Sequence, residues 1–257
     1  MSTRADVALV ERGLARSRTL ARRLIEAGAV LTDGPGGEVP VTRAAQTIFP
    51  DQPLRVLESE ATRFVSRGGN KLDAALQTAG IDCTGLDALD VGMSTGGFTH
   101  CLLARGARQV LGIEVGHGQL DPFLAADPRV HCLEHTHIRD VHLADLRLPD
   151  GTAPAQGFAL IVVDLSFIAA SHLLDKLATL AAPAGRLACL IKPQFELGPQ
   201  ARNRQGIVRA DADLDGLRRD VIQRAEDAGW QVNDWQRCAL VGGDGNQEYF
   251  LIATRRP

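Results

Sequence analysis

Short runs of apolar residues alternate along most of the chain with stretches in which apolar residues recur at helical spacing. The runs predict strands over 86–91, 109–114, 129–133, 158–164 and 186–191. The helical spacing predicts helices over 97–105, 119–126, 169–181 and 212–228. Two further strands are expected near 230–240 and 248–254, and the last should be antiparallel. This alternation predicts an α/β fold with a mostly parallel sheet that is covered on both faces.

The first part of the chain follows a different pattern. A short helix is expected to end at Gly13, and a second helix, capped by Ser17, is expected to end at Gly28. Strand-like runs follow at 29–32 and 54–57. The pattern therefore predicts a small α+β unit that is separate from the larger sheet.

The length of 257 residues fits one large domain or two unequal domains. We expect the small unit at 1–58, a linker at 59–65 and the larger unit at 66–257. Two stretches of the larger unit, 135–157 and 193–210, lack periodicity and are expected to be loops at the edge of the sheet.

A glycine-rich turn at 90–97, D-V-G-M-S-T-G-G, lies between a predicted strand and a predicted helix. Glycines let the backbone approach a ligand closely, and the start of a helix offers free N–H groups. A dinucleotide site would have the pattern G-x-G-x-x-G. Here Ser94 replaces the middle glycine, and Asp90 stands two residues before Gly92.

The acid at Asp90 would repel a pyrophosphate, but it suits the ammonium group of S-adenosylmethionine (SAM). The next strand ends at Glu114, about twenty residues on, where an acid can hold a ribose diol. These two acids favour a SAM site, and the alternative is a plain tight turn. The expected cofactor-binding residues are Asp90, Gly92, Ser94, Thr95, Gly96, Gly97 and Glu114.

Charged residues stand at the ends of several predicted strands. Asp164 ends one strand, Lys192 ends the next, and Glu248 begins the final strand. If that strand is antiparallel, all three lie at the carboxyl edge of the sheet, where doubly wound folds bind ligands. Lys71, from the helix before the sheet, could reach the same edge. Such a group suits methyl transfer to a hydroxyl, because a lysine can accept the hydroxyl proton. Individually, charged residues at strand ends are often only solvated.

Arginines crowd the two N-terminal helices. Arginine pairs well with phosphate oxygens, so this face is a candidate RNA-binding surface, and the alternative is an ordinary solvated face. The expected RNA-binding residues are Arg12, Arg16, Arg18, Arg22 and Arg23.

The composition narrows the classes of protein. The five cysteines are odd in number and scattered, which favours reduced core residues in a cytoplasmic protein over disulfides or a zinc site. No metal is expected, because the four histidines between His131 and His142 lack a convincing helical ligand spacing. No membrane span or signal peptide is found, and the net charge of −3 does not decide for or against nucleic acid. A monomer is expected, although no feature fixes the oligomeric state.

Six motifs occur in a defined order along the larger unit. They are S-R-G-G-x-K-L at 66–72, D-V-G-x-S-T-G-G-F-T at 90–99, V-G-x-G-Q-L at 115–120, D-L-S-F-I at 164–168, I-K-P-Q-F-E at 191–196 and G-N-Q-E at 245–248. They resemble the TlyA-type (hemolysin A) rRNA methyltransferases, relatives of the FtsJ-like 2′-O-methyltransferases. The N-terminal R-G-L-A-x-S-R, A-G-x-V and D-G sequences resemble the small RNA-binding domain of a ribosomal protein.

The resemblance implies a Rossmann-like SAM-dependent methyltransferase that methylates cytidine 2′-hydroxyls in ribosomal RNA, with rRNA or ribosomal subunits as partners. It places a catalytic tetrad on Lys71, Asp164, Lys192 and Glu248, and it places SAM binding on Asp90, Gly92, Ser94, Gly96 and Glu114. The family usually has other residues at three positions, where this chain carries Glu114, His117 and His137.

Two other classes of function remain open. One is a SAM-dependent methyltransferase of another RNA or of a small molecule. The other is a membrane-active hemolysin, which would need an exposed amphipathic or spanning segment, and the sequence contains none.

Overall fold

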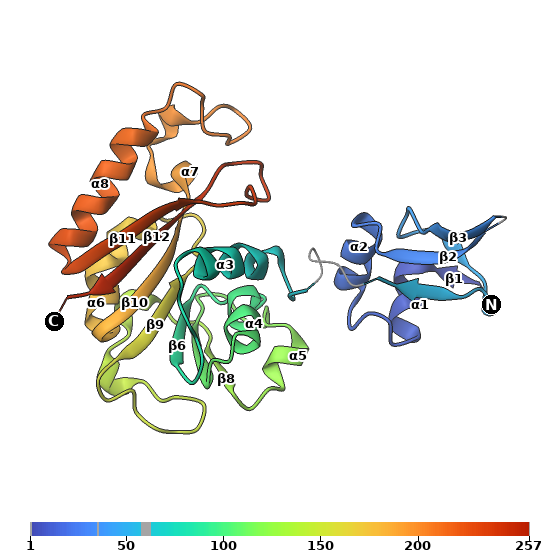
Figure 1. Cartoon of the computed structure of the whole chain (residues 1–257), viewed down its shortest axis with the longest axis horizontal. Helices are drawn as coiled ribbons and strands as arrows, with labels where there is room; N and C mark the ends of the chain where they lie inside the picture. Colours follow the sequence, from blue (N-terminus) through green and yellow to red (C-terminus); the bar gives the residue numbers. More distant parts are fainter. Residues whose placement is uncertain (1, 35, 58–62, 257) are drawn as a thin grey trace. The chain divides into compact units, whose positions relative to one another are not determined.

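The computed structural model describes residues 2–34, 36–57 and 63–256. The chain divides into two compact units, Met1–Asn70 and Lys71–Pro257, which are described separately below (Figure 1). Of the linker predicted at 59–65, the part at 59–62 lies outside the described residues.

The N-terminal unit is a small α+β unit, as predicted, and its short strands pair antiparallel. The elements are β1 (Thr3–Arg4), α1 (Ala5–Glu11), α2 (Arg18–Glu26), β2 (Val30–Gly34), β3 (Gly37–Pro40), β4 (Thr47–Ile48) and β5 (Leu54–Val56). β2 is central in the order β3-β2-β5, and β1 pairs with β4. The Ser17 hydroxyl caps α2 by accepting a hydrogen bond from the Leu20 N–H at 3.2 Å. A small core forms where Leu9 and Leu24 of the helices meet Val30 and Ile48 of the strands.

The larger unit is built on a seven-stranded sheet with the order β11-β12-β10-β9-β6-β7-β8. The strands β10, β9, β6, β7 and β8 pair in parallel, and β12 is antiparallel to both β10 and β11, so the predicted direction of the last strand is confirmed. The strands are β6 (Asp87–Val91), β7 (Gln109–Ile113), β8 (Val130–Leu133), β9 (Phe158–Val163), β10 (Ala181–Ile191), β11 (Trp230–Arg237) and β12 (Tyr249–Arg255).

Helices cover both faces of the sheet, with α3 and α4 on one side and α6 and α8 on the other (Figure 1). Alternation along β6 sends Leu89 into the core shared with Leu177 of α6 and Val221 of α8. On the opposite face, the ring of Phe98 in α4 stacks on Phe250, with ring centres 6.0 Å apart. The helices are α3 (Arg67–Thr78), α4 (Gly97–Ala104), α5 (Pro122–Ala125), α6 (Leu174–Leu180), α7 (Pro193–Glu196) and α8 (Leu214–Asp227).

Several predicted boundaries were wrong. The stretch expected to be a loop over 193–210 begins with the short helix α7 (Pro193–Glu196). The helix expected over 119–126 is only the short α5, because Asp121 caps it through the Phe123 N–H at 3.0 Å and Pro122 fixes its first turn. β10 starts at Ala181, five residues earlier than expected, and its pairing with β9 is irregular before Arg186.

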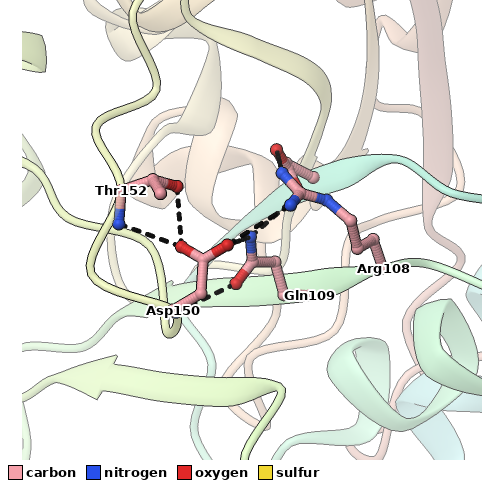
Figure 2. A network of polar contacts seen from close by, with 5 residues as sticks. Arg108, Gln109, Asp150 and Thr152 are labelled. Atoms are coloured by element: carbon pink, nitrogen blue, oxygen red, sulfur yellow. Dashed lines mark hydrogen bonds and ion pairs between the residues drawn. The ribbon is translucent and has the colours of Figure 1, made fainter.

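The long loop expected at 135–157 is tied to the amino end of β7 by a polar network (Figure 2). The Asp150 carboxylate accepts hydrogen bonds from the Thr152 hydroxyl at 2.6 Å, from the Gln109 amide at 3.0 Å and from Arg108 at 3.3 Å. The bonds from Thr152, with smaller contributions from Gln109 and Arg108, lower the pKa of Asp150 to about 2. The network fixes the loop at the end of the sheet opposite the glycine-rich turn.

Candidate active site

The strand order places the predicted site residues next to one another at one edge of the sheet. Glu248 precedes β12, Lys192 follows β10, Asp164 follows β9, Gly92 follows β6 and Glu114 follows β7. The chain leaves β6 toward β7 in one direction and returns to β9 in the other, so the switch point of the sheet lies between β6 and β9. Ligands of doubly wound sheets bind at such a point.

The four residues of the expected tetrad form two ion pairs. The Lys192 ammonium lies 2.6 Å from an Asp164 carboxylate oxygen and donates a hydrogen bond to the Ser166 hydroxyl at 3.1 Å. The Lys71 ammonium donates to Glu248 at 2.5 Å. Both lysine side chains are largely buried, with 11% of Lys192 and 9% of Lys71 exposed. The ion pairs hold both lysines in fixed positions at the edge.

The glycine-rich turn passes very close to the strand end that carries Asp164. Gly92 has φ +85°, and a Cβ placed there would lie 2.3 Å from the Asp164 carbonyl oxygen. Both its backbone conformation and its surroundings therefore demand glycine. Ser94, where a dinucleotide site would have glycine, also lies in the left-handed region with φ +47°.

A pocket of about 470 Å³ opens at the switch point, within the size range of small-molecule sites. Four of the predicted residues line it, namely Gly92, Ser94, Glu114 and Asp164. The other lining residues were not predicted as site residues: Val91, Ile113, Val115, Gly116, Gln119, Thr136, His137, Ile138, Leu165, Ser166, Phe167 and Ile168.

Glu114 is held at the wall of this pocket by the backbone. One carboxylate oxygen accepts a hydrogen bond from the Ser94 N–H at 2.9 Å, and the other accepts from the Gly116 N–H at 2.8 Å. The Ser94 hydroxyl donates to the Gln119 side-chain carbonyl at 3.1 Å. Because a carboxylate has about four acceptor sites, Glu114 keeps capacity for further donors.

Asp90 lies behind the turn and not on the pocket wall. Its side chain is fully buried, and one oxygen accepts a hydrogen bond from the Thr99 hydroxyl at 2.7 Å. Its other oxygen meets no donor from the part of the chain that the structure describes. Burial raises the pKa of Asp90 to about 7, and the charges of Asp164 and Glu114 add to the shift. Thr95, Gly96 and Gly97 do not line the pocket either.

Several site residues that sequence reasoning missed lie inside the motifs it used. Ser166, which contacts Lys192, belongs to D-L-S-F-I, and Gln119 belongs to V-G-x-G-Q-L. Thr99, the partner of Asp90, ends the glycine motif. The signal was therefore present, but only the structure assigns a partner to each side chain.

The N-terminal arginines have partners within their own unit. Arg12 donates to the carbonyls of Phe49, Pro50 and Gln52, and Arg23 donates to those of Phe64 and Val65. Burial, and then the charge of Arg16, lowers the pKa of Arg23. These contacts give Arg12 and Arg23 a structural role.

Arg18 and Arg22 converge with Arg4 on the fully buried Asp6. The hydrogen bond from Arg4 is the largest cause of a pKa for Asp6 well below its usual range, and the other two arginines add to it against the effect of burial. The side chains of Arg18 and Arg22 remain 54% and 53% exposed, so both can also meet a ligand from solvent.

The depressed pKa of Asp6 predicts acid sensitivity of the N-terminal unit. The stabilisation from Asp6 is complete above the unfolded-state pKa of about 4, and it is lost as the pH falls below that value toward the folded-state pKa. Hydrogen-exchange protection factors of α1 and α2 should therefore drop between pH 6 and pH 3. Asp6→Asn should lower protection at pH 6 and flatten this dependence. An equally steep fall in the variant would contradict the role of Asp6.

Neither a membrane span nor a metal cluster is found within residues 2–34, 36–57 and 63–256. No helix there is long and apolar enough to cross a bilayer. No group of three or more potential ligands from histidine, cysteine, aspartate and glutamate is placed to hold an ion. All five cysteines are free thiols.

Comparison with known proteins gives the same two-part division. Residues 64–255 match the FtsJ-like methyltransferase family, and residues 3–34 match the S4 domain. The chain is 39% identical to the 16S/23S rRNA (cytidine-2′-O)-methyltransferase TlyA of Mycobacterium tuberculosis, over 96% of this chain and 88% of that protein. It is 32% identical to hemolysin A of Brachyspira hyodysenteriae, over 96% of this chain and 98% of that protein. A solved structure from Streptococcus thermophilus that carries a hemolysin name has 30% identity and a TM-score of 0.73, covering 99% of this chain and 89% of its own.

Proposed function

Because the chain belongs to the FtsJ-like methyltransferase family, we propose that it transfers the methyl group of SAM to a cytidine 2′-hydroxyl in ribosomal RNA. One observation carries the proposal. The Lys192–Asp164 pair lies beside a ligand-sized pocket at the switch point of the sheet, since Asp164 and Ser166 both line that pocket and contact Lys192. A cation and a carboxylate beside a cofactor pocket suit proton removal from an acceptor hydroxyl.

The pocket fits SAM by its size and its donor set. The turn at Gly92 leaves no room for a side chain, so the backbone itself forms the wall there. Glu114 offers carboxylate oxygens to a ribose diol at the neighbouring strand end. SAM would supply a methyl group on a positively charged sulfur. The residues of this chain bind and orient both reactants.

We predict that Gly92→Ala will weaken SAM binding at least ten-fold, because the added Cβ would collide with the Asp164 carbonyl oxygen. Calorimetry with SAM measures this directly. Gly80→Ala is the matched control, since Gly80 has a similar positive φ of +62° but a Cβ added there would meet nothing within 4 Å. Both variants carry backbone strain, and only Gly92→Ala should lose SAM. Equal affinities in the two variants would remove the turn from the cofactor site.

We propose that Lys192 is the catalytic residue that acts on the acceptor hydroxyl. Its ammonium is fixed by Asp164 and Ser166, and its position beside the pocket lets it assist the loss of the 2′-hydroxyl proton. Lys71 and Glu248 form the second, more deeply buried pair at the same edge. We assign this pair to shaping the electrostatic environment of the acceptor.

An exposed aromatic side chain beside the pocket favours a nucleotide substrate. Phe167 lines the pocket, is 87% exposed and has φ +70°, which is costly for a residue with a bulky side chain. The Phe195 ring lies 5.4 Å from it, centre to centre. Enzymes that modify single nucleotides in RNA stack unpaired bases on such rings. We therefore infer that Phe167 stacks on the target base.

The S4 unit supplies a second part of the RNA contact, through the half-exposed arginines of α2. Arg18→Gln and Arg22→Gln should each weaken RNA binding and reduce its salt slope by about one unit for each true phosphate contact. Arg43→Gln, on an exposed arginine outside both helices, is the control. If neither α2 variant differs from it, this face is only a solvated surface.

The proposed function is tested by incubating the purified protein with SAM and ribosomal RNA or isolated subunits, and by mapping 2′-O-methylation. A new modification at one cytidine, absent without SAM and absent with Lys192→Ala, is the expected result. Methylation at a base nitrogen or carbon would overturn the assignment to 2′-hydroxyls. Lysis of membranes without any RNA methylation would favour the function that the hemolysin names suggest.

A further inference from the structure

The loop between α7 and α8 carries three arginines that the proposed function has not used. Arg209 is paired with Asp211 at 2.9 Å. The side chains of Arg202 and Arg204, in contrast, have no hydrogen bond or ion pair to any residue that the structure describes. They differ in this from Arg12, Arg18 and Arg22, whose guanidinium groups are already engaged.

This arginine loop, residues 201–209, has a defined backbone structure. Arg202 and Val208 form an antiparallel bridge, and the Arg209 N–H donates to the Ala201 carbonyl at 2.8 Å. At its tip, the Asn203 side chain accepts hydrogen bonds from the N–H groups of Gln205 and Ile207, each at 2.9 Å. The two free arginines are therefore presented by a folded turn.

The buried side chain of Asn246 links the arginine loop to the catalytic edge, which is the edge of the sheet that carries Lys192 and Glu248. The Asn246 side chain, in a residue only 1% exposed, accepts from the Val208 N–H at 2.8 Å and donates to the Gly206 carbonyl at 3.1 Å. Asn246 stands two residues before Glu248, and its own carbonyl accepts from the Gly242 N–H at 2.7 Å. A Cβ on Gly242 would lie 2.8 Å from a Glu248 oxygen, so this turn packs directly against Glu248.

Hydrogen bonds through Asp244 also connect Asn246 to the strand end that carries Lys192. The Gln194 amide donates to Asp244 at 3.2 Å, and the Asn246 amide donates to the same Asp244 oxygen at 2.8 Å. Gln194 is 3% exposed and follows Lys192 by two residues. The arginine loop is thus bound, through two nearly buried amides, to both strand ends that supply the tetrad.

We propose that Arg202 and Arg204 bind phosphates of the substrate RNA next to the target nucleotide. The inference rests on the proposed function. A ribose held at Lys192 has a phosphate on each side, and these charges must lie near the catalytic edge. Guanidinium groups presented there by a folded turn can bind phosphate in a bidentate manner, and their planar shape reduces the side-chain freedom lost per hydrogen bond formed. Asn246 acts as a positioning residue, because it sets where the two cations stand.

The test compares methylation kinetics of the Arg202→Gln/Arg204→Gln double variant with those of the wild type at several salt concentrations. We expect the KM for RNA to rise several-fold and the salt slope to fall by about one unit per arginine. The kcat at saturating RNA and the affinity for SAM should not change. Arg186→Gln is the matched control: this exposed arginine lies on β10, the strand that ends before Lys192, roughly 20 Å back along the strand.

Asn246→Ala removes the side-chain hydrogen bonds that hold the arginine loop, without changing any charge. It should raise the KM for RNA as the double variant does, while SAM affinity is retained. If the double variant matches Arg186→Gln in KM and salt slope, the inference is wrong, even though a wild type that methylates rRNA still supports the proposed function. If the wild type does not methylate rRNA under any condition, the proposed function itself fails. A normal KM in Asn246→Ala would show that Asn246 does not position the two arginines.

Discussion

Replacing Lys192 with alanine should slow methyl transfer by about a hundred- to ten-thousand-fold, the usual contribution of a positioned proton-transfer group. The Lys192 ammonium is held by Asp164 at 2.6 Å and by Ser166 at 3.1 Å, beside the pocket and not within its wall. SAM affinity should therefore change little, so the loss should appear in kcat. Single-turnover methylation of rRNA and calorimetry with SAM measure the two effects separately.

To accept the hydroxyl proton, Lys192 must first give up a proton of its own and react as the neutral amine. Lys192→Arg should therefore fail almost as badly, because arginine remains charged and cannot take a proton. The composition supports this distinction between the two cations. Only three of the 28 lysine and arginine residues are lysines, and two of them, Lys71 and Lys192, belong to the proposed tetrad. If the site needed only a positive charge, arginine would serve there as it does in the rest of the chain.

The remaining lysine, Lys176 on α6, provides the control for this experiment. Lys176→Ala should retain full activity. A Lys192→Ala enzyme that methylates rRNA at a near-normal rate would exclude Lys192 from the mechanism and leave Lys71 as the candidate. Rescue of activity by Lys192→Arg would mean that the residue contributes charge and not proton transfer.

The sequence was sufficient to predict the fold and the edge of the sheet where the four residues of the proposed tetrad lie. Strand periodicity predicted β6, β9 and the carboxyl end of β10 closely, and Asp164 and Lys192 could be placed because each directly follows such a strand. The antiparallel direction of β12 then brought Glu248 to the same edge. For Asp164 and Lys192 a local pattern fixes the position, since parallel strands present their carboxyl ends together.

Side-chain partners could not be predicted, because they depend on contacts between distant elements. Nothing in the local pattern around Asp90 indicates that its carboxylate is buried, bonded to Thr99 and absent from the pocket wall. Arg12 was likewise expected to bind RNA, but its guanidinium donates to the carbonyls of Phe49 and Gln52, about forty residues away in the sequence. Periodicity in the sequence cannot indicate such contacts. Whether these residues bind ligand stays a prediction.

Breaking the Lys71–Glu248 pair should cause the largest loss of stability among single changes in the site. Glu248→Ala would leave the Lys71 ammonium, whose side chain is 9% exposed, without its partner at 2.5 Å. Removing one member of a buried ion pair typically costs about 3–5 kcal/mol, because the other charge stays desolvated. For a unit of this size, the melting temperature should fall by on the order of ten degrees.

A double substitution that removes both charges separates the effect on stability from the effect on catalysis. Lys71→Met with Glu248→Leu removes both charges, and a buried ion pair replaced by apolar residues is often neutral or stabilising. We therefore expect the double variant to recover most of the melting temperature lost in Glu248→Ala, with methylation still abolished. Asp211→Ala, which breaks the exposed Arg209–Asp211 pair, should leave the melting temperature unchanged. Should Glu248→Ala melt as the wild type does, the pair contributes no net stability, and its placement at the edge would have to be explained by catalysis alone.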